Sequence, residues 1–123
     1  MESVAQSFMQ ILVCIKLLHW QTLSYAKHIA SDSLHEKMSK NIDKFMEIYQ
    51  AKANRRIEFK PLPVHIFLKN FDARNDSQFL KEVQDWLEKQ LVRFINQNDT
   101  VLLNIRDEML GDVRQTIYLF SFS

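Results

Sequence analysis

Five side chains in the first half of the sequence are of types that bind transition metals: His19, His28, Asp32, Asp43 and Glu47. His28 and Asp32 are four residues apart, and so are Asp43 and Glu47. Residues at this spacing lie one turn apart on the same helix face, so each pair can offer two ligand atoms to one ion. Imidazole and carboxylate ligands together suit iron, manganese or zinc. The five residues are therefore our candidate metal ligands.

A wider polar stripe surrounds four of these residues. At about 100° per residue, a narrow sector of the helix holds His28, Asp32, His35, Ser39, Asp43 and Gln50, with Glu36 and Glu47 at its edge. Such a stripe is usually a solvated helix face, and any one of these residues alone is more simply explained in that way. His19 is different, because it falls on an apolar helix face where an unpartnered imidazole is costly.

The elements that must position these residues are helices. Apolar periodicity predicts helices over residues 2–24, 26–51 and about 100–120, and a third helix between the capping residues 75–77 and the polar turn 96–99. One glycine and two prolines in 123 residues fit long helices with few turns. The side chains expected to face inward from the third helix are Phe79, Leu80, Val83, Trp86, Leu87, Leu91 and Phe94.

The lengths of the connections predict the topology of a single domain, residues 1–123. Short links make antiparallel pairs of the first and second helices and of the third and fourth, which brings His19 towards His28. The link 52–75 is long enough to cross the bundle, and its prolines at 60–63 exclude helix interior. We expect a short helix at 64–71 within this link. An all-α four-helix bundle with one long crossover between its second and third helices is the ferritin-like plan.

Three short motifs resemble the Dps-type mini-ferritins, a branch of the ferritin-like superfamily. They are HW at 19–20, HIASD at 28–32 and DKFME at 43–47. The resemblance implies that His19, His28, Asp32, Asp43 and Glu47 are ferroxidase ligands, with Trp20 beside them. It also implies that Fe(II) is oxidised by peroxide or oxygen and stored as mineral in a twelve-subunit shell. The pattern HWxTxSYAxH followed by DxFxExYQ is similar as well to small ferritin-like proteins encoded by phages and large DNA viruses.

Helix arithmetic predicts that the site is shared between two copies of the chain. Eleven residues separate Asp32 from Asp43, or about 16 Å along a helix. Ligands of one ion lie within about 2.5 Å of it, so one chain cannot bring both pairs to the same ion. A homodimer in which the two second helices pack antiparallel can bring both pairs to one ion. Its two-fold axis would pass near Lys37 and Met38, and Leu34 and Met38 would supply apolar contact between the two copies. Each site then takes His19, His28 and Asp32 from one subunit and Asp43 and Glu47 from the other.

The composition of the chain limits which binding partners and which cellular location we expect. A formal net charge of +1 gives no strong signal for nucleic acid or an anionic membrane. The apolar run before Trp20 is interrupted by Lys16 and His19, short of the roughly 20 residues that span a bilayer. The single Cys14 cannot form an internal disulfide and fits a cytoplasmic protein, or a virion if the chain is viral. The alternative to a ferroxidase is a non-enzymatic helical module that self-associates or serves as a structural virion protein.

Overall fold

The computed structural model describes residues 1–61 and 63–123, and this part of the chain contains helices and no strand. The all-α class predicted from the sequence is confirmed. The helices are α1 (Glu2–Gln21), α2 (Tyr25–Ala53), α3 (Asp76–Asp85) and α4 (Thr100–Phe120), and α3 continues into a π-helical turn (Trp86–Gln90) and a 3-10 turn (Leu91–Phe94). The first helix ends three residues earlier than predicted.

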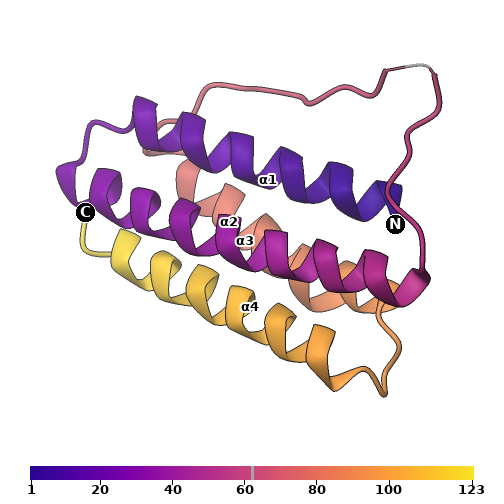
Figure 1. The fold of residues 1–123 in the computed structure, drawn as a ribbon. Coiled ribbons are helices and arrows are strands. Elements are labelled where there is room, and N and C mark those ends of the chain that lie inside the picture. Colours follow the sequence, from indigo (N-terminus) through magenta and orange to yellow (C-terminus); the bar gives the residue numbers. More distant parts are fainter. Residues whose placement is uncertain (62) are drawn as a thin grey trace.

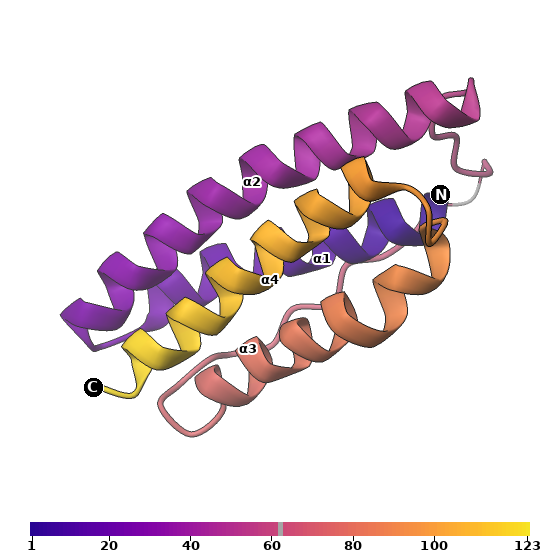
Figure 2. The ribbon, with the colours of Figure 1, turned by 90° about the horizontal axis from the view of Figure 1, so that it is seen from below.

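The four helices lie side by side with their axes roughly aligned (Figures 1 and 2). α1 and α2 form an antiparallel pair, and α4 returns antiparallel to α3. α2 and α3 run in the same direction, so the crossover, residues 54–75, spans the length of the molecule between them. No helix in the described part of the chain has the length and apolar character that a membrane span requires.

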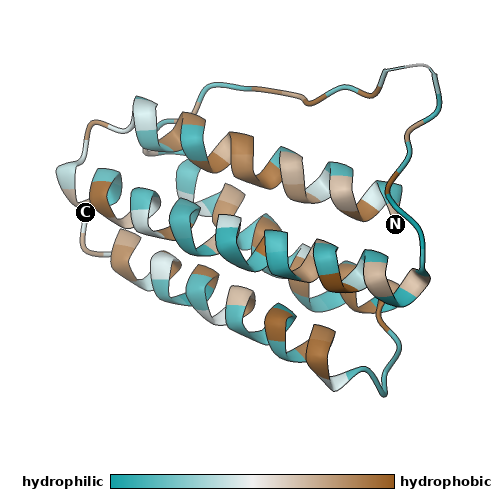
Figure 3. Ribbon diagram, in the orientation of Figure 1, coloured by the Kyte–Doolittle hydropathy of each residue, from teal (hydrophilic) through white to brown (hydrophobic). Residues whose placement is uncertain are grey.

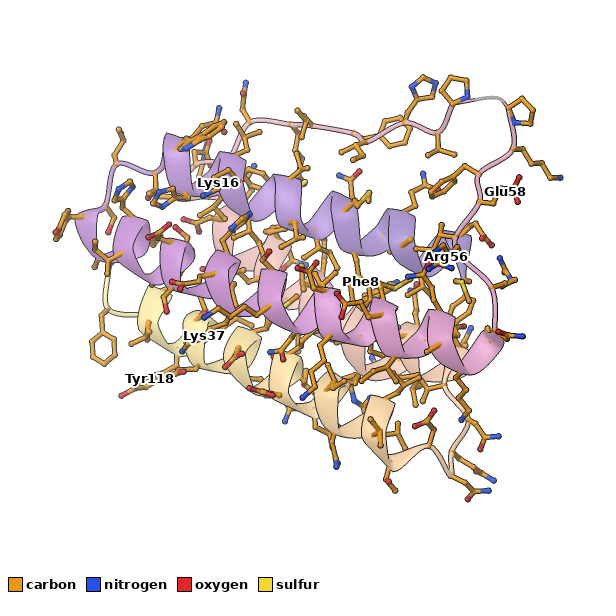
Figure 4. All side chains as sticks on the ribbon, viewed as in Figure 1. Phe8, Lys16, Lys37, Arg56, Glu58 and Tyr118 are labelled. Carbon is orange, nitrogen blue, oxygen red and sulfur yellow. The ribbon has the colours of Figure 1, made fainter. Side chains whose placement is uncertain are left out.

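The interior is apolar and is built by all four helices. Side chains shielded almost completely from water include Phe8, Phe45, Met38, Leu87 and Met109. Hydrophobic and hydrophilic stretches alternate along the helices (Figure 3), and the buried Phe8 projects from α1 into the bundle (Figure 4). Burying one large apolar side chain contributes about 1.5–3 kcal/mol, so this core is the main source of stability. Leu34 and Met38 face this core, so the prediction that they contact a second copy is wrong.

Residues 64–71, which we call the strap, belong to no helix and follow an elongated course beside α1 (Figure 1). The prediction of a short helix here is wrong. Pro61 and Pro63 precede the strap. Its main-chain groups bond mostly to glutamine side chains of α1, and the carbonyl of Asn70 accepts from Asn75, but they do not bond to one another. Apolar letters in a run of eight do not separate an extended segment from a helix, because the deciding contacts come from elsewhere in the chain.

The third helix changes its winding before it ends. The π-helical turn at Trp86–Gln90 carries more residues per turn than an α-helix, so it rotates the residues that follow it. Leu91 stays buried, whereas Phe94 is 43% exposed and its carbonyl accepts a hydrogen bond from Tyr49 Oη at 3.3 Å. The inward position predicted for Phe94 is therefore wrong, because it assumed α-helical winding throughout.

Two ion pairs fasten the ends of the bundle. Lys27 Nζ lies 2.8 Å from Asp76 Oδ2, and both side chains are more than nine-tenths buried. The pair joins the start of α2 to the start of α3, and Lys27 Nζ also lies 5.3 Å from the centre of the Phe120 ring. At the opposite end, Arg55 makes two hydrogen bonds of 2.8 and 3.1 Å to Glu2, joining the crossover to the first turn of α1.

Candidate metal half-site

The short α1–α2 connection brings two histidines into contact. His19 lies in the last turn of α1 and His28 in the first turn of α2. The main-chain N–H of Thr22 closes α1, and Ser24 caps α2 by accepting a hydrogen bond from the N–H of Lys27 at 3.2 Å. The imidazole rings stack with centroids 3.9 Å apart and planes 17° apart. The proximity predicted from the helical hairpin is present.

The two histidines hold each other by a reciprocal pair of hydrogen bonds. His19 Nδ1 lies 2.8 Å from the carbonyl oxygen of His28, and His28 Nδ1 lies 2.9 Å from the carbonyl oxygen of His19. A carbonyl only accepts, so each Nδ1 carries the proton. In the neutral form of each ring, the lone pair is then on Nε2. This is the tautomer that metal-binding histidines adopt when a main-chain carbonyl orients them.

Asp32 stands beside this histidine pair. Its Oδ1 lies 3.8 Å from His19 Nε2, with the His19 side chain 12% exposed and the Asp32 side chain 61% exposed. Two ligand atoms each about 2.1 Å from one ion lie at most about 4.2 Å apart, so this separation is compatible with a shared ion. His19 is thus anchored inside the protein, while the carboxylate faces outward.

Ser31 supports this arrangement, and His35 lies further along the same helix. Ser31 is buried, donates to the carbonyl of His28 at 3.2 Å and lies 3.3 Å from His19 Nδ1. His35, one turn beyond Ser31, is half-buried, and burial together with the charge of Lys16 lowers the pKa of its imidazole. The sequence indicated no role for Ser31, since a serine one position from the polar stripe looks like any helix-surface serine.

The other two predicted ligands lie far from the histidine pair. Asp43 and Glu47 are both exposed, further along α2. Because α2 is unbroken from Tyr25 to Ala53, the separation of about 16 Å between Asp32 and Asp43 stands. Glu47 borders a shallow groove of about 370 Å³ that also includes Arg55 and Arg56. Within residues 1–61 and 63–123, no three His, Cys, Asp or Glu side chains are grouped to hold a metal ion.

Four exposed apolar side chains, which we call the apolar rim, lie close to His19 and His28 in the sequence, around the α1–α2 connection. The rim consists of Trp20, Leu23, Tyr25 and Ile29, which are 71%, 104%, 78% and 51% exposed. The ring of Tyr25 also stacks against His28 with centroids 6.4 Å apart. Several exposed large apolar side chains near one connection are typical of a surface that another protein covers.

The comparisons with known proteins give a family and no function. A model of a family of unknown function, DUF5856, matches residues 19–120, which include all five candidate ligands. No curated protein matches the chain. No solved structure matches it either.

Proposed function

We propose that this chain, which belongs to the family of unknown function DUF5856, is a ferritin-like protein that binds and oxidises Fe(II) at a site shared by two copies. In this proposal the four helices and the long crossover between α2 and α3 are the ferritin-like plan. The motifs HW, HIASD and DKFME carry the resemblance to Dps-type mini-ferritins. Each half-site is completed by Asp43 and Glu47 of a second copy.

The observation that carries the proposal is the reciprocal bonding of the two histidines. Each Nδ1 proton is held by the other residue's carbonyl, at 2.8 and 2.9 Å, which leaves Nε2 as the free atom on both rings. In a neutral ring this leaves the Nε2 lone pair available for a metal ion, and at His19 that atom lies 3.8 Å from Oδ1 of Asp32. Beside Asp32, two such nitrogens form an incomplete set of ligands for a divalent transition metal.

The residues of the site have separate tasks in this proposal. Nε2 of His19 and His28 bind Fe(II) as neutral ligands, and the carboxylates of Asp32, Asp43 and Glu47 offset its charge. More carboxylate ligands favour Fe(III) over Fe(II), which assists the loss of one electron per iron. Hydrogen peroxide or dioxygen is the electron acceptor, and each peroxide molecule takes electrons from two Fe(II) ions.

The exposed face of α2 is suited to an antiparallel copy of itself. Glu36 and Lys40 lie on either side of the predicted axis near Lys37, so a second copy places Glu36 of one chain beside Lys40 of the other. The same arrangement sets Asp32 opposite Asp43. The apolar rim around Trp20 supplies the contacts that the polar face of α2 lacks.

Mixing two inactive variants tests the shared site most directly. Asp32→Ala and Asp43→Ala should each abolish rapid Fe(II) oxidation while leaving helicity unchanged, because both residues lie on the surface. In a mixed dimer, one site carries both substitutions and the other carries neither. After unfolding and refolding together, the two variants should recover about a quarter of the parent's rate, since half of the dimers are mixed and each has one intact site.

Glu108→Ala, which removes an exposed acid from α4, is the matched control and should oxidise Fe(II) like the parent. If both single variants are inactive and their mixture is inactive too, all the ligands belong to one chain, and the proposal of a shared site is wrong. If both single variants oxidise Fe(II) at the parent's rate, the ferroxidase proposal itself is wrong.

A second function is favoured by the exposed apolar rim. Trp20, Leu23 and Tyr25 are suited to protein contacts whether or not metal binds, as in a helical module that self-associates or takes a place in a virion. Metal content distinguishes the two functions. Protein purified without chelator and then exposed to Fe(II) should bind about one or two ions per subunit if the site is real. A module without metal function binds none and still self-associates.

A further inference from the structure

The strap is bound to α1 through one edge of its main chain. Gln10 donates from Nε2 to the carbonyl of Phe67 at 2.5 Å and accepts from the N–H of Phe67 at 2.8 Å. Gln6 donates to the carbonyl of His65 at 3.2 Å, and Gln21 accepts from the N–H of Phe71 at 2.7 Å. All the strap residues whose N–H or C=O bonds to α1 have odd numbers.

The spacing of these contacts explains why the strap is extended. Gln6 and Gln10 are four residues apart, about 6 Å along a helix, and they bond to strap residues two apart, about 6.6 Å along a strand. The amide of Gln10 bonds to both main-chain groups of Phe67, as a neighbouring strand would. α1 therefore serves the strap as a substitute for one strand of a sheet.

Between residues 64 and 68, the other edge of the strap has no protein partner in the part of the chain that the structure describes, whereas further along the carbonyl of Asn70 accepts a hydrogen bond from Asn75 Nδ2 at 3.0 Å. In an extended chain, the N–H and C=O of one residue point to the same side, and those of the next residue point to the opposite side. The groups of Val64, Ile66 and Leu68 therefore point away from α1. Across residues 1–61 and 63–123, no hydrogen bond reaches the N–H or C=O of these three residues. Their side chains are 48%, 38% and 58% exposed.

Natural proteins protect such an edge, and here the protection is incomplete. Proline and lysine are common devices against unwanted strand pairing, and Pro63 and Lys69 stand at the two ends of the stretch 64–68. Between them, VHIFL is rich in β-branched and aromatic residues and has no acidic or lysine or arginine side chain. Five residues of extended main chain remain open to a further strand.

We propose that the free edge of the strap pairs with the strap of a second copy as an antiparallel two-stranded ribbon. Ile66 lies opposite its own counterpart, and Val64 lies opposite Leu68, so that each of the three pairs exchanges two main-chain hydrogen bonds. This pairing mode is strand addition at an exposed edge. It goes beyond the proposed Fe(II) site, because it uses a different face of the molecule.

Charge favours the antiparallel arrangement over the parallel one. Antiparallel pairing about Ile66 places the two Lys69 side chains at opposite ends of the ribbon and brings the Lys60 end of one crossover to the Asp72 end of the other. Parallel pairing in register would set the two lysines directly opposite each other, which is destabilising. A second copy is therefore a partner of complementary charge for this edge.

Cysteine cross-linking tests directly which residues of the two straps lie opposite each other. In the proposed ribbon, the Cα atoms of the two Ile66 residues are about 5.5 Å apart, within the range of about 4.4–6.8 Å that a disulfide bridges. Ile66→Cys should thus form a covalent dimer under mild oxidation. Val64→Cys should not, since four residues along a strand separate its two copies by about 13 Å. A mixture of Val64→Cys and Leu68→Cys should cross-link, because these two positions lie opposite each other.

Two double variants test the role of the outer main chain. Adding Leu68→Pro to Ile66→Cys removes an outward N–H and should slow cross-linking several-fold. Adding His65→Pro removes an inward N–H and should leave cross-linking unchanged. The parent, with its buried Cys14, is the control for the native thiol. The proposal is overturned if Val64→Cys cross-links as readily as Ile66→Cys, or if neither does. Cross-links at residue 66 report the strap alone, so the result does not depend on the dimer through α2.

Discussion

A charged group buried in this fold depends on a single partner side chain, and Lys27 is the clearest example. Its ammonium and the carboxylate of Asp76 are 6% and 3% exposed as residues and 2.8 Å apart. Lys27→Met leaves a buried carboxylate without its counter-charge, which should lower the free energy of unfolding by about 3–5 kcal/mol. Urea denaturation followed by circular dichroism measures the change.

Two further variants show whether the loss comes from the orphaned charge. Lys27→Met combined with Asp76→Leu should recover most of the stability, because no unpaired charge then remains in the interior. Lys40→Met, in an exposed pair with Glu36, should change the free energy of unfolding by less than about 0.5 kcal/mol. If Lys27→Met is as mild as Lys40→Met, water reaches Asp76 and the pair is not truly buried.

The sequence predicted which residues meet at the histidine pair but not how they bond. The spacing of His19 and His28 across a helical hairpin was enough to predict their proximity. Their reciprocal Nδ1 contacts depend on ring orientation, which residue spacing does not encode. The sequence does not indicate the Lys27–Asp76 pair for a related reason: Asp76 has only the signature of a helix-capping segment, and 49 residues separate the two partners.

Among the elements, the crossover is fastened to α1 by a pair whose strength depends on pH. The hydrogen bonds from Arg55, followed by one from the N–H of Glu58, lower the pKa of Glu2 from 4.5 to about 2. A carboxyl whose pKa is lowered in the folded state adds stability above its unfolded pKa. This stability should be lost as the pH falls from about 4.5 to 2. Thermal unfolding measured across that range should show it.

Glu2→Gln removes the titrating group and is the variant that isolates this contribution. It should make the protein less stable at pH 7 and should flatten the fall in melting temperature between pH 4.5 and 2. Glu58→Gln is the matched control, because its exposed side chain forms no ion pair with any residue that the structure describes. An unchanged pH profile for Glu2→Gln would show that the contact between α1 and the crossover is absent in solution.

The sequence predicts the boundaries of a helix well where the helix is regular, and poorly where its winding changes. α2 and α4 match their predicted ranges to within two residues, since their apolar residues keep one period from end to end. The third helix was predicted as one α-helix, but the winding changes at Trp86. The strap was predicted as helix because its partners, Gln6 and Gln10, lie more than fifty residues earlier.

At the scale of the whole molecule, the helices depend on one shared core. Phe8 of α1 makes edge-to-face contacts with Phe45 of α2 and with Trp86 after α3, both at centroid distances of 5.3 Å. Phe45 is fully buried. Phe45→Ala should therefore lower the free energy of unfolding by about 3–5 kcal/mol, through lost burial and the cavity that remains.

The same variant tests whether the domain unfolds as a unit. Helicity and the fluorescence of Trp86 should be lost in a single transition, because removing one core side chain weakens every helix that packs on it. Trp20→Phe removes the signal of the other, exposed tryptophan and provides the background for this measurement. Tyr118→Ala, at a 62% exposed position on α4, should shift the free energy by less than about 0.5 kcal/mol. Separate transitions for the two probes would show that α1 and α2 form a stable hairpin on their own, and the histidine pair would then persist without α3 and α4.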